Sequence, residues 1–354
     1  MSKSKRVFVF LVIFFFAIIF AHATAFSFSK AKYVFFFIGD GMGFSQVDLA
    51  RSFYGELVFL KFDFKGRVIT TSFDGGIPDS ASSATALATG QKTLNRVIGM
   101  DYTRRKKLKS MAYLAKSKGM KVGIVTDVSL DDATPAAFYS CQPSRFNYYY
   151  IALDLVNSGF DYLVGNDLIG NSKKYRNERP NIIELARGKG CRVVRSMKEL
   201  YSFKGKRALI LFGTKEFSSK NDVTLATFVK GGIDFLYNDR GFLMIIEEGK
   251  IDWACHANDV KNAIEGIKAL DEAVSVAFSF YKQHPEETLI VVTADHETGG
   301  LYLDSSYKIK WGTKGHTKAP VPIFAHGTGA FLFKGVLDNT DVAKNIMRVA
   351  GLAF

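Results

Sequence analysis

Two aspartate–histidine pairs have the spacing of metal ligands. Asp252 and His256 are four residues apart, so on a helical turn both side chains would lie on one face. Asp295 and His296 come just after residues 289–293, the strongest β-type run in the chain, where a turn can bring both to one site. A carboxylate oxygen and an imidazole nitrogen are ligands that zinc accepts. The two pairs therefore indicate a cation site, although a surface Asp–His pair would have the same spacing.

A glycine-rich turn with the sequence GDGMG, residues 39–43, follows an apolar run. A dinucleotide-binding turn would need a third glycine where Phe44 stands. In addition, Asp40 would direct a carboxylate at the pyrophosphate. The turn therefore suits a cation better than a dinucleotide, and an ordinary turn is the alternative.

A serine begins the alanine-rich stretch SASSATA, residues 80–86. The hydroxyl oxygen of Ser80 would lie in the positive field of a helix N-terminus. That field and an adjacent metal ion could both stabilise an alkoxide, which would make Ser80 a nucleophile. The alternative is that Ser80 only caps the helix.

Strands and helices alternate along the chain. Short apolar runs predict buried strands at residues 33–38, 68–72, 122–126, 162–164, 208–212, 242–246 and 289–293. Helical spacing appears at residues 111–118, 182–187 and 262–281. This order predicts an α/β fold, a three-layer sandwich with a central, mostly parallel sheet and helices on both faces. Ligands bind beyond the carboxyl ends of such strands, so the polar segments that follow the runs should converge at one edge.

The N-terminal segment has the layout of a secretory signal peptide. A short basic region is followed by the apolar residues 7–20 and by small residues around Ala25, where we expect cleavage. Residues 1–25 are therefore expected to be removed, leaving residues 26–354 as a single catalytic domain. The alternative is an uncleaved membrane anchor. No later apolar stretch is long enough to span a membrane.

Net charge and cysteine content restrict the possible functions less than the motifs do. The formal net charge of +13 would favour nucleic acid, an anionic surface or anionic small molecules. The densest basic cluster, residues 104–109, is typical of a solvated loop. Three cysteines are too few for a disulfide framework, although one bridge remains open.

Taken together, these segments resemble the alkaline phosphatase family over nearly the whole mature chain. The matching segments are, in order along the chain, GDGMG, DSASSATA, DATPAA, IDWACH, ADH and GHT. The resemblance implies the three-layer fold and a set of site residues. Ser80 would be the nucleophile and Arg145 the phosphate clamp. Two Zn²⁺ ions would be held, the first by Asp252, His256 and His316, and the second by Asp40, Asp295 and His296. One Mg²⁺ ion would be held by Asp40, Asp132, Thr134 and Glu247.

The resemblance also implies an activity, a set of partners and a location. It implies hydrolysis of a broad range of phosphomonoesters through a phosphoserine, releasing inorganic phosphate. The expected partners are small phosphomonoesters and phosphate, with no specific nucleic acid and no stable membrane span after signal cleavage. If the chain forms an oligomer, we expect a homodimer. The expected location is outside the cytoplasm, in a periplasm or the extracellular space.

Two details of the site depart from a simple match. Glu247 and Glu248 are neighbours, and we favour Glu247 because it precedes Asp252 by five residues, as in the family pattern. Trp253 stands where relatives carry Lys, His or Trp, and Asp132 stands where other members carry His. A tryptophan cannot supply the positive charge of a lysine, so phosphate affinity and metal preference are expected to differ from the lysine type.

Three alternative functions remain open from the sequence. The segment Cys141-x-Pro-Ser-Arg145 matches a sulfatase signature, but the residues that usually follow it are absent. A phosphodiesterase of the same superfamily is the nearest enzymatic alternative. Such enzymes usually lack the DATP magnesium segment, so the presence of Thr134 in this chain argues against it. A non-catalytic, basic anion-binding protein is the alternative from another class.

Overall fold

The structure is a computed structural model, and it describes residues 30–196, 199, 203, 205–213, 223–306 and 308–352. The expected signal peptide, residues 1–25, lies outside the described residues. In the part of the chain that is described, we find no helix with the length and apolarity needed to cross a bilayer. The three cysteines, Cys141, Cys191 and Cys255, are all free.

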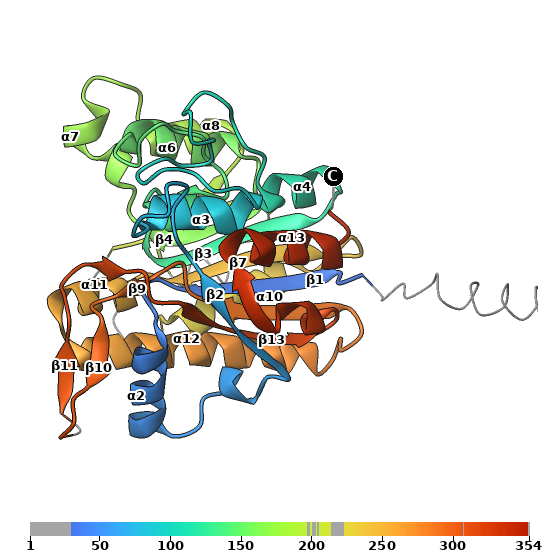
Figure 1. Ribbon diagram of the computed structural model, residues 1–354. Helices are drawn as coiled ribbons and strands as arrows, with labels where there is room; N and C mark the ends of the chain where they lie inside the picture. Colours follow the sequence, from blue (N-terminus) through green and yellow to red (C-terminus); the bar gives the residue numbers. More distant parts are fainter. Residues whose placement is uncertain are drawn as a thin grey trace, which may run out of the picture.

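A ten-stranded sheet runs through the centre of the protein (Figure 1). Its strands lie in the order β14-β2-β13-β8-β1-β7-β3-β4-β6-β5. All neighbouring pairs are parallel except the two that β13 makes with β8 and β2. The strands are β1 (Tyr33–Gly39), β2 (Phe64–Ile69), β3 (Lys121–Ser129), β4 (Tyr162–Asn166), β5 (Arg192–Val194), β6 (Ala208–Phe212), β7 (Phe242–Glu248), β8 (Thr288–Thr293), β13 (Val321–Gly327) and β14 (Gly335–Asp338).

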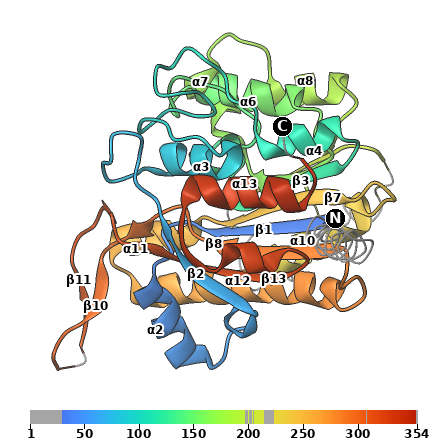
Figure 2. The ribbon, with the colours of Figure 1, turned by 45° about the vertical axis from the view of Figure 1, so that its right-hand side comes forward.

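Helices cover both faces of the sheet (Figures 1 and 2). One face is covered by α12 (Val260–Tyr281) and α10 (Leu225–Leu236), with α2 (Phe44–Tyr54) and α11 (Lys250–Ala257) packed beside α12. The other face is covered by α3 (Ser80–Thr89), α4 (Met111–Ser117), α5 (Ala133–Ala136) and α13 (Asn339–Val349). Beyond them lie α6 (Tyr148–Asn157), α7 (Lys173–Arg176) and α8 (Ile182–Gly188).

Short elements complete the fold. Two small antiparallel sheets pair β9 (Glu297–Thr298) with β12 (His316–Thr317), and β10 (Leu301–Leu303) with β11 (Ile309–Trp311). Within the described ranges, the short 3₁₀ helices are η1 (Phe59–Lys61), η2 (Ile169–Asn171) and η3 (Ala330–Phe333).

The hydrophobic pattern explains the central position of β1. Its sequence, YVFFFIG, is buried at every position, as expected for a parallel strand with helices on both faces. The long helix α12 has a different pattern, with apolar residues three or four apart. Ile264, Ile267, Leu270 and Val274 are buried in this way and form a stripe on one side of the helix.

The α/β fold with a central, mostly parallel sheet and helices on both faces is confirmed. One expected strand is shifted, because the strand near residues 68–72 is β2 at Phe64–Ile69. In this strand Lys65 and Arg67 alternate with less exposed residues. Its sequence is therefore not a continuous apolar run, the pattern from which the strands were predicted. The antiparallel β13 and the two edge strands, β14 and β5, were not among the expected strands.

Candidate active site

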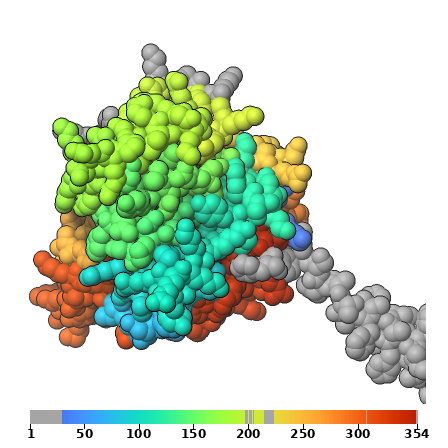
Figure 3. Space-filling model, turned by 90° about the horizontal axis from the view of Figure 1, so that it is seen from above, coloured from blue at the N-terminus to red at the C-terminus, as the bar shows by residue number. Residues whose placement is uncertain are grey.

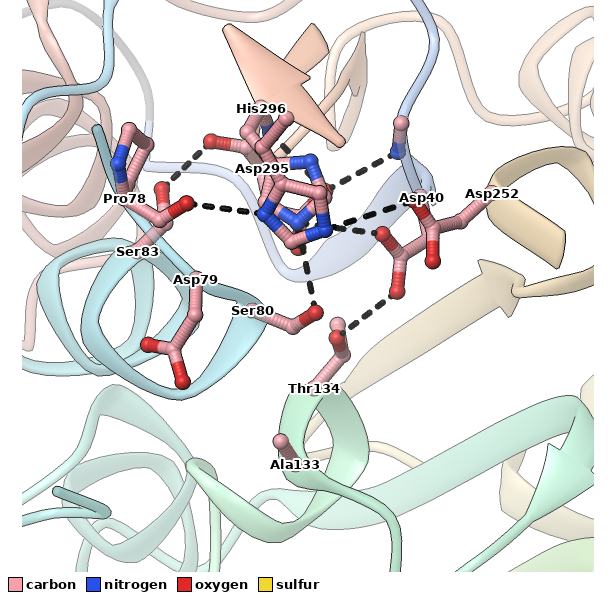
Figure 4. A network of polar contacts seen from close by, with 12 residues as sticks. Asp40, Pro78, Asp79, Ser80, Ser83, Ala133, Thr134, Asp252, Asp295 and His296 are labelled. Carbon is pink, nitrogen blue, oxygen red and sulfur yellow. Dashed lines mark hydrogen bonds and ion pairs between the residues drawn. The ribbon is translucent and has the colours of Figure 1, made fainter. Parts of the chain in front are cut away.

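Four adjacent strands of the sheet, β8, β1, β7 and β3, end at the same edge. Asp40 follows the last residue of β1, and Glu247 is the second-last residue of β7. Asp295 lies two residues beyond β8, and Thr134 lies in α5, just beyond β3. The polar segments therefore meet at the carboxyl edge, as Figure 4 shows for the labelled side chains.

The first cluster surrounds the imidazole of His296. Its Nε2 atom lies 3.2 Å from Ser80 Oγ, 3.4 Å from Asp40 Oδ1 and 3.3 Å from Asp295 Oδ2 (Figure 4). Neither of these two carboxylate oxygens has a hydrogen-bond donor among the described residues, although both are buried. An unpartnered buried carboxylate oxygen is costly unless a cation or a proton satisfies it.

The hydroxyl of Thr298 determines which nitrogen of His296 carries the proton. Thr298 Oγ1 donates its single hydrogen to Asp252 Oδ1 at 2.6 Å. It lies 3.2 Å from His296 Nδ1, so it must accept a hydrogen bond from that nitrogen. The Nε2 atom therefore has a lone pair, and this lone pair faces Ser80 and the two carboxylates. Burial, and then His316, lower the pKa of His296 well below its ordinary value, which keeps the ring neutral.

The second cluster contains Asp252, His256 and His316. His256 Nε2 lies 3.1 Å from His316 Nε2 and 3.3 Å from Asp252 Oδ2. His316 Nε2 lies 3.7 Å from Asp252 Oδ1. The two Nδ1 atoms contact backbone carbonyls, that of Lys314 at 2.5 Å from His256 and that of Pro78 at 2.8 Å from His316.

Because a carbonyl only accepts hydrogen bonds, both Nδ1 atoms carry hydrogen in this cluster. In the neutral rings the two Nε2 lone pairs would face each other. A proton or a metal ion must lie between them. The hydrogen bond to Asp252 raises the pKa of His256 to about 9, so a proton competes with a metal ion for this position.

The third cluster presents oxygen atoms alone. Thr134 Oγ1 donates to Asp40 Oδ2 at 3.2 Å, and Thr126 Oγ1 donates to Glu247 Oε2 at 2.5 Å. Asp132 is paired with Arg145, and its charge adds to the effect of burial on the pKa of Glu247. Carboxylate and hydroxyl oxygens without nitrogen are the ligand set that suits magnesium.

The buried carboxylates resist ionisation without cations. Burial, and then the charge of Asp295, raise the pKa of Asp40 well above its ordinary value. Burial also raises the pKa of Glu247 well above the ordinary value, and that of Asp295 to about 7, where the charge of Asp252 adds to the effect. Asp252 differs. Burial raises its pKa, but the hydrogen bond to His256, the charges of the neighbouring histidines and the hydrogen bond from Thr298 together lower it below its ordinary value.

These observations show that the residues fit divalent cations. Three carboxylates with raised pKa values, Asp40, Glu247 and Asp295, lie together with the imidazole rings. The Nε2 atoms of the neutral rings present lone pairs and have no hydrogen to donate to the carboxylates. The ligand atoms of Asp40, Asp295 and His296 lie within 4.8 Å of one another, and so do those of Asp252, His296 and His316. His296 thus lies within reach of both groups, while the sequence placed it with the second ion alone.

Helix α3 presents the candidate nucleophile. Asp79 is its N-cap and accepts a hydrogen bond from Ser82 N at 2.9 Å, and Ser82 completes a capping box. Ser80 is therefore the first helical residue and is not the cap. Its hydroxyl remains directed at His296, in the positive field of the helix N-terminus.

Arg145 lies between two acidic side chains. Its Nη2 atom is 3.0 Å from Asp132 Oδ1, and its Nη1 atom is 3.5 Å from Asp79 Oδ2. Although burial lowers the pKa of Arg145, the charges of Asp132 and Asp79 raise it above its ordinary value, so the group stays charged. The guanidinium is held in one orientation and can bind two oxygens of an anion.

The structure also places the residues that were ambiguous in the sequence. Neighbouring residues of β7 point to opposite sides, so Glu247 reaches Thr126 while Glu248 is directed at Asp127. Trp253 follows Asp252 and is half exposed. Cys141 Sγ contacts Leu108 O at 3.7 Å, away from the clusters described above.

The sequence reasoning missed three side chains that position the others: Thr298, Asp79 and Thr126. Asp79 had a local signal, since aspartate is a preferred N-cap residue and it directly precedes an alanine-rich stretch. Thr298 and Thr126 had none, because their partners are distant in the sequence.

Thr298→Val should weaken zinc binding by about 10- to 100-fold, because Asp252 loses a hydrogen-bond donor and His296 loses the acceptor that fixes its tautomer. Valine has nearly the same shape, so the buried site should stay packed. Thr298→Ser keeps the hydroxyl and is the matched control, expected to bind zinc within a few-fold of the parent. Competition with a chelating dye measures both, and equal affinity in the valine variant would contradict the assigned role.

The fold and the site define a metal-dependent enzyme that acts on an anionic substrate. Comparisons with known proteins give the family. A family model described as alkaline phosphatase matches residues 31–309. Alkaline phosphatase 4 of Bacillus subtilis (strain 168) is 30% identical over 344 residues, covering 91% of this chain and 72% of the relative. Streptomycin-6-phosphate phosphatase of Streptomyces griseus is 27% identical and covers 91% of each chain.

Solved structures agree. The alkaline phosphatase from the Antarctic bacterium TAB5 is 29% identical, with a TM-score of 0.83 over 92% of this chain and 99% of that chain. A histidine-to-aspartate mutant of that enzyme has magnesium bound. The present chain belongs to the alkaline phosphatase family and is a phosphomonoester-hydrolysing, metal-binding enzyme.

Proposed function

We propose that Ser80 is the nucleophile through which this enzyme hydrolyses a broad range of phosphomonoesters. The observation that carries the proposal is the position of its Oγ atom, 3.2 Å from His296 Nε2 and at the N-terminus of α3. Asp79 caps the helix, so the serine hydroxyl is free for chemistry. The substrates are small phosphomonoesters, the product is inorganic phosphate, and no specific nucleic acid is required.

Arg145 binds two oxygens of the substrate phosphate and orients the phosphorus toward Ser80. Asp79 and Asp132 hold the guanidinium for this purpose. The Ser80 Oγ–P bond forms as the ester P–O bond breaks, and the alcohol leaves with a proton. Water then attacks the phosphoserine, inorganic phosphate leaves, and the serine hydroxyl is restored.

The metal ions belong to this proposal as well. Asp252, His256 and His316 would hold one Zn²⁺, Asp40, Asp295 and His296 a second Zn²⁺, and Asp40, Asp132, Thr134 and Glu247 one Mg²⁺. The bound ions would supply positive charge that lowers the pKa of a hydroxyl or of water and offsets the charge of the phosphate. The nitrogen-bearing clusters favour zinc and the oxygen cluster favours magnesium.

Export and domain organisation complete the proposal. Residues 1–25 act as a signal peptide, and residues 26–354 form one catalytic domain that works in a periplasm or outside the cell. The basic, apolar and small-residue order of the first 25 residues supports export. One continuous ten-stranded sheet supports a single domain. If the enzyme oligomerises, a homodimer is expected.

A trapped phosphoenzyme tests the nucleophile directly. Incubation with inorganic phosphate at mildly acidic pH, followed by acid quenching and peptide mass spectrometry, should find one phosphoryl group on Ser80. Fragmentation must separate Ser80 from Ser82 and Ser83, which lie in the same peptide. Phosphate on another residue, or formylglycine at Cys141 with sulfate-ester hydrolysis, would overturn the proposal.

A further inference from the structure

The loop that carries Arg96 is hydrogen-bonded through its backbone to Asp79, the residue before Ser80, and to Arg145. Arg96 N donates to Asp79 Oδ2 at 2.9 Å, the same oxygen that lies 3.5 Å from Arg145 Nη1. Arg145 N donates to Arg96 O at 2.7 Å. The side chain of Asn95 adds to this, since its Oδ1 accepts from Asp79 N at 3.0 Å. Arg96 is therefore fixed at the rim of the phosphate site.

The backbone of Arg96 adopts a conformation that an arginine rarely takes. Its φ is +69°, in the left-handed region that favours glycine. Arg104 has a similar φ of +60° in an exposed turn, so the conformation alone does not indicate a function. What distinguishes Arg96 is that the strained residue is bonded on both sides to groups of the candidate active site.

The side chain of Arg96 is free to meet a ligand. It is exposed, and within the described ranges its guanidinium makes no ion pair and no hydrogen bond. Its Cζ atom lies 5.7 Å from the ring centroid of Phe146, the residue directly after the clamp. Phe146 is itself 54% exposed and packs at 6.5 Å against Tyr148, at the start of α6. The Arg96 cation thus lies over the ring of the residue that directly follows Arg145. In the space-filling view from above, the cyan part of the chain adjoins the green part that follows it (Figure 3).

We propose that Arg96 binds a second anionic group, a carboxylate or a phosphate, on the alcohol part of the substrate. The proposal rests on the proposed phosphomonoesterase function and adds a substrate class to it. Arg145 binds the phosphate that is removed, and Arg96 binds the negative charge that remains on the leaving group. Its planar, permanently charged guanidinium suits carboxylate and phosphate oxygens alike.

A matched pair of substrates tests the proposal. 3-Phosphoglycerate and glycerol 3-phosphate have the same chain length, but only the first has a carboxylate beyond the phosphate ester. The parent enzyme should prefer 3-phosphoglycerate in kcat/KM, and added salt should reduce the preference. Arg96→Gln should lower the ratio of the two kcat/KM values by roughly three- to tenfold, mainly through a higher KM for 3-phosphoglycerate.

Three further variants separate binding from structure. Arg96→Lys should recover part of the preference, because it keeps the charge. Arg96→Gly should lose the preference without lowering the Tm, since glycine accepts the left-handed backbone. Arg104→Gln is the matched control, an exposed arginine of similar conformation that should keep the parent ratio.

Two other results would contradict the role of Arg96 or the proposed function. An unchanged ratio in Arg96→Gln, or an equal loss with both substrates, would overturn the role of Arg96 while leaving the phosphomonoesterase function intact. A parent enzyme that hydrolyses neither substrate nor simple aryl phosphates would overturn the proposed function, and this inference with it.

Discussion

Ser80→Ala is expected to lower kcat for p-nitrophenyl phosphate by at least about a thousandfold, with the bound metal ions retained. The expectation follows from the absence of any other hydroxyl directed at His296 Nε2 among the described residues. Without the nucleophile, only phosphate binding and electrostatic stabilisation would remain. Steady-state kinetics at alkaline pH, with the metal content of each sample measured, would test this.

A neighbouring serine is the control for Ser80. Ser82 lies in the same helix, but its single hydroxyl hydrogen is shared between Asn95 Oδ1 at 2.8 Å and Asp79 O at 3.1 Å. Ser82→Ala should destabilise the helix start by about 1 kcal/mol and change kcat far less than Ser80→Ala does. Full activity in Ser80→Ala would show that the nucleophile is another group.

Removal of divalent ions is expected to abolish activity and to destabilise the protein most at alkaline pH. Asp40, Glu247 and Asp295 are buried together and have raised pKa values, about 7 for Asp295. A raised pKa in the folded state means that the protonated form is favoured there. The stability from these groups is therefore present below their ordinary pKa of about 4 and is lost as the pH rises through the folded values.

The pKa of His256, raised to about 9, also makes the folded state less stable as the pH rises, because the proton that stabilises it is lost at higher pH. The lowered pKa of Asp252 acts in the opposite direction, but its effect is complete once the pH exceeds about 4. The lowered pKa of His296 also acts in the opposite direction, and its effect is complete once the pH exceeds its ordinary value of about 6.5. The Tm of the metal-free protein should thus fall between about pH 6.5 and pH 9. Added cations should raise the Tm more at the higher pH, because they then compensate ionised carboxylates.

Thermal unfolding after chelation, with and without returned zinc and magnesium, measures this effect. Zinc and magnesium together should restore activity, and magnesium alone should not, because the two histidine-bearing clusters suit zinc. A metal-free Tm that is independent of pH, or activity that survives chelation, would contradict the cation assignments.

Much of the fold was predictable from the sequence because the central strands are continuous apolar runs. The strands β1, β6, β7 and β8 appear close to their expected places for this reason. β13 was harder, since a proline argues against an interior strand. Pro322 is tolerated because it lies near the start of β13, whose pairing with β8 begins only at Phe324. The strands β9 and β12 have two residues each, too few for any periodicity.

The candidate site was predictable in part for a different reason. The motifs around Asp40, Ser80 and Asp295 are local, and each follows a strand or begins a helix. The structure brings their side chains together, while their chemical roles remain proposals. Thr298 could not be found in this way, because its hydroxyl gains importance only when β9 places it between Asp252 and His296.

The position of β1 in the sheet has a consequence for how the chain folds. This first strand is paired on both sides by late ones, β7 at Phe242–Glu248 and β8 at Thr288–Thr293. Its apolar sequence therefore has no partner until most of the protein has been synthesised, and such non-local pairing slows folding. During that interval the strand is a site for aggregation, so a newly made chain depends on being kept unfolded or shielded. The same delay means that metal ions can be captured only at the end of folding.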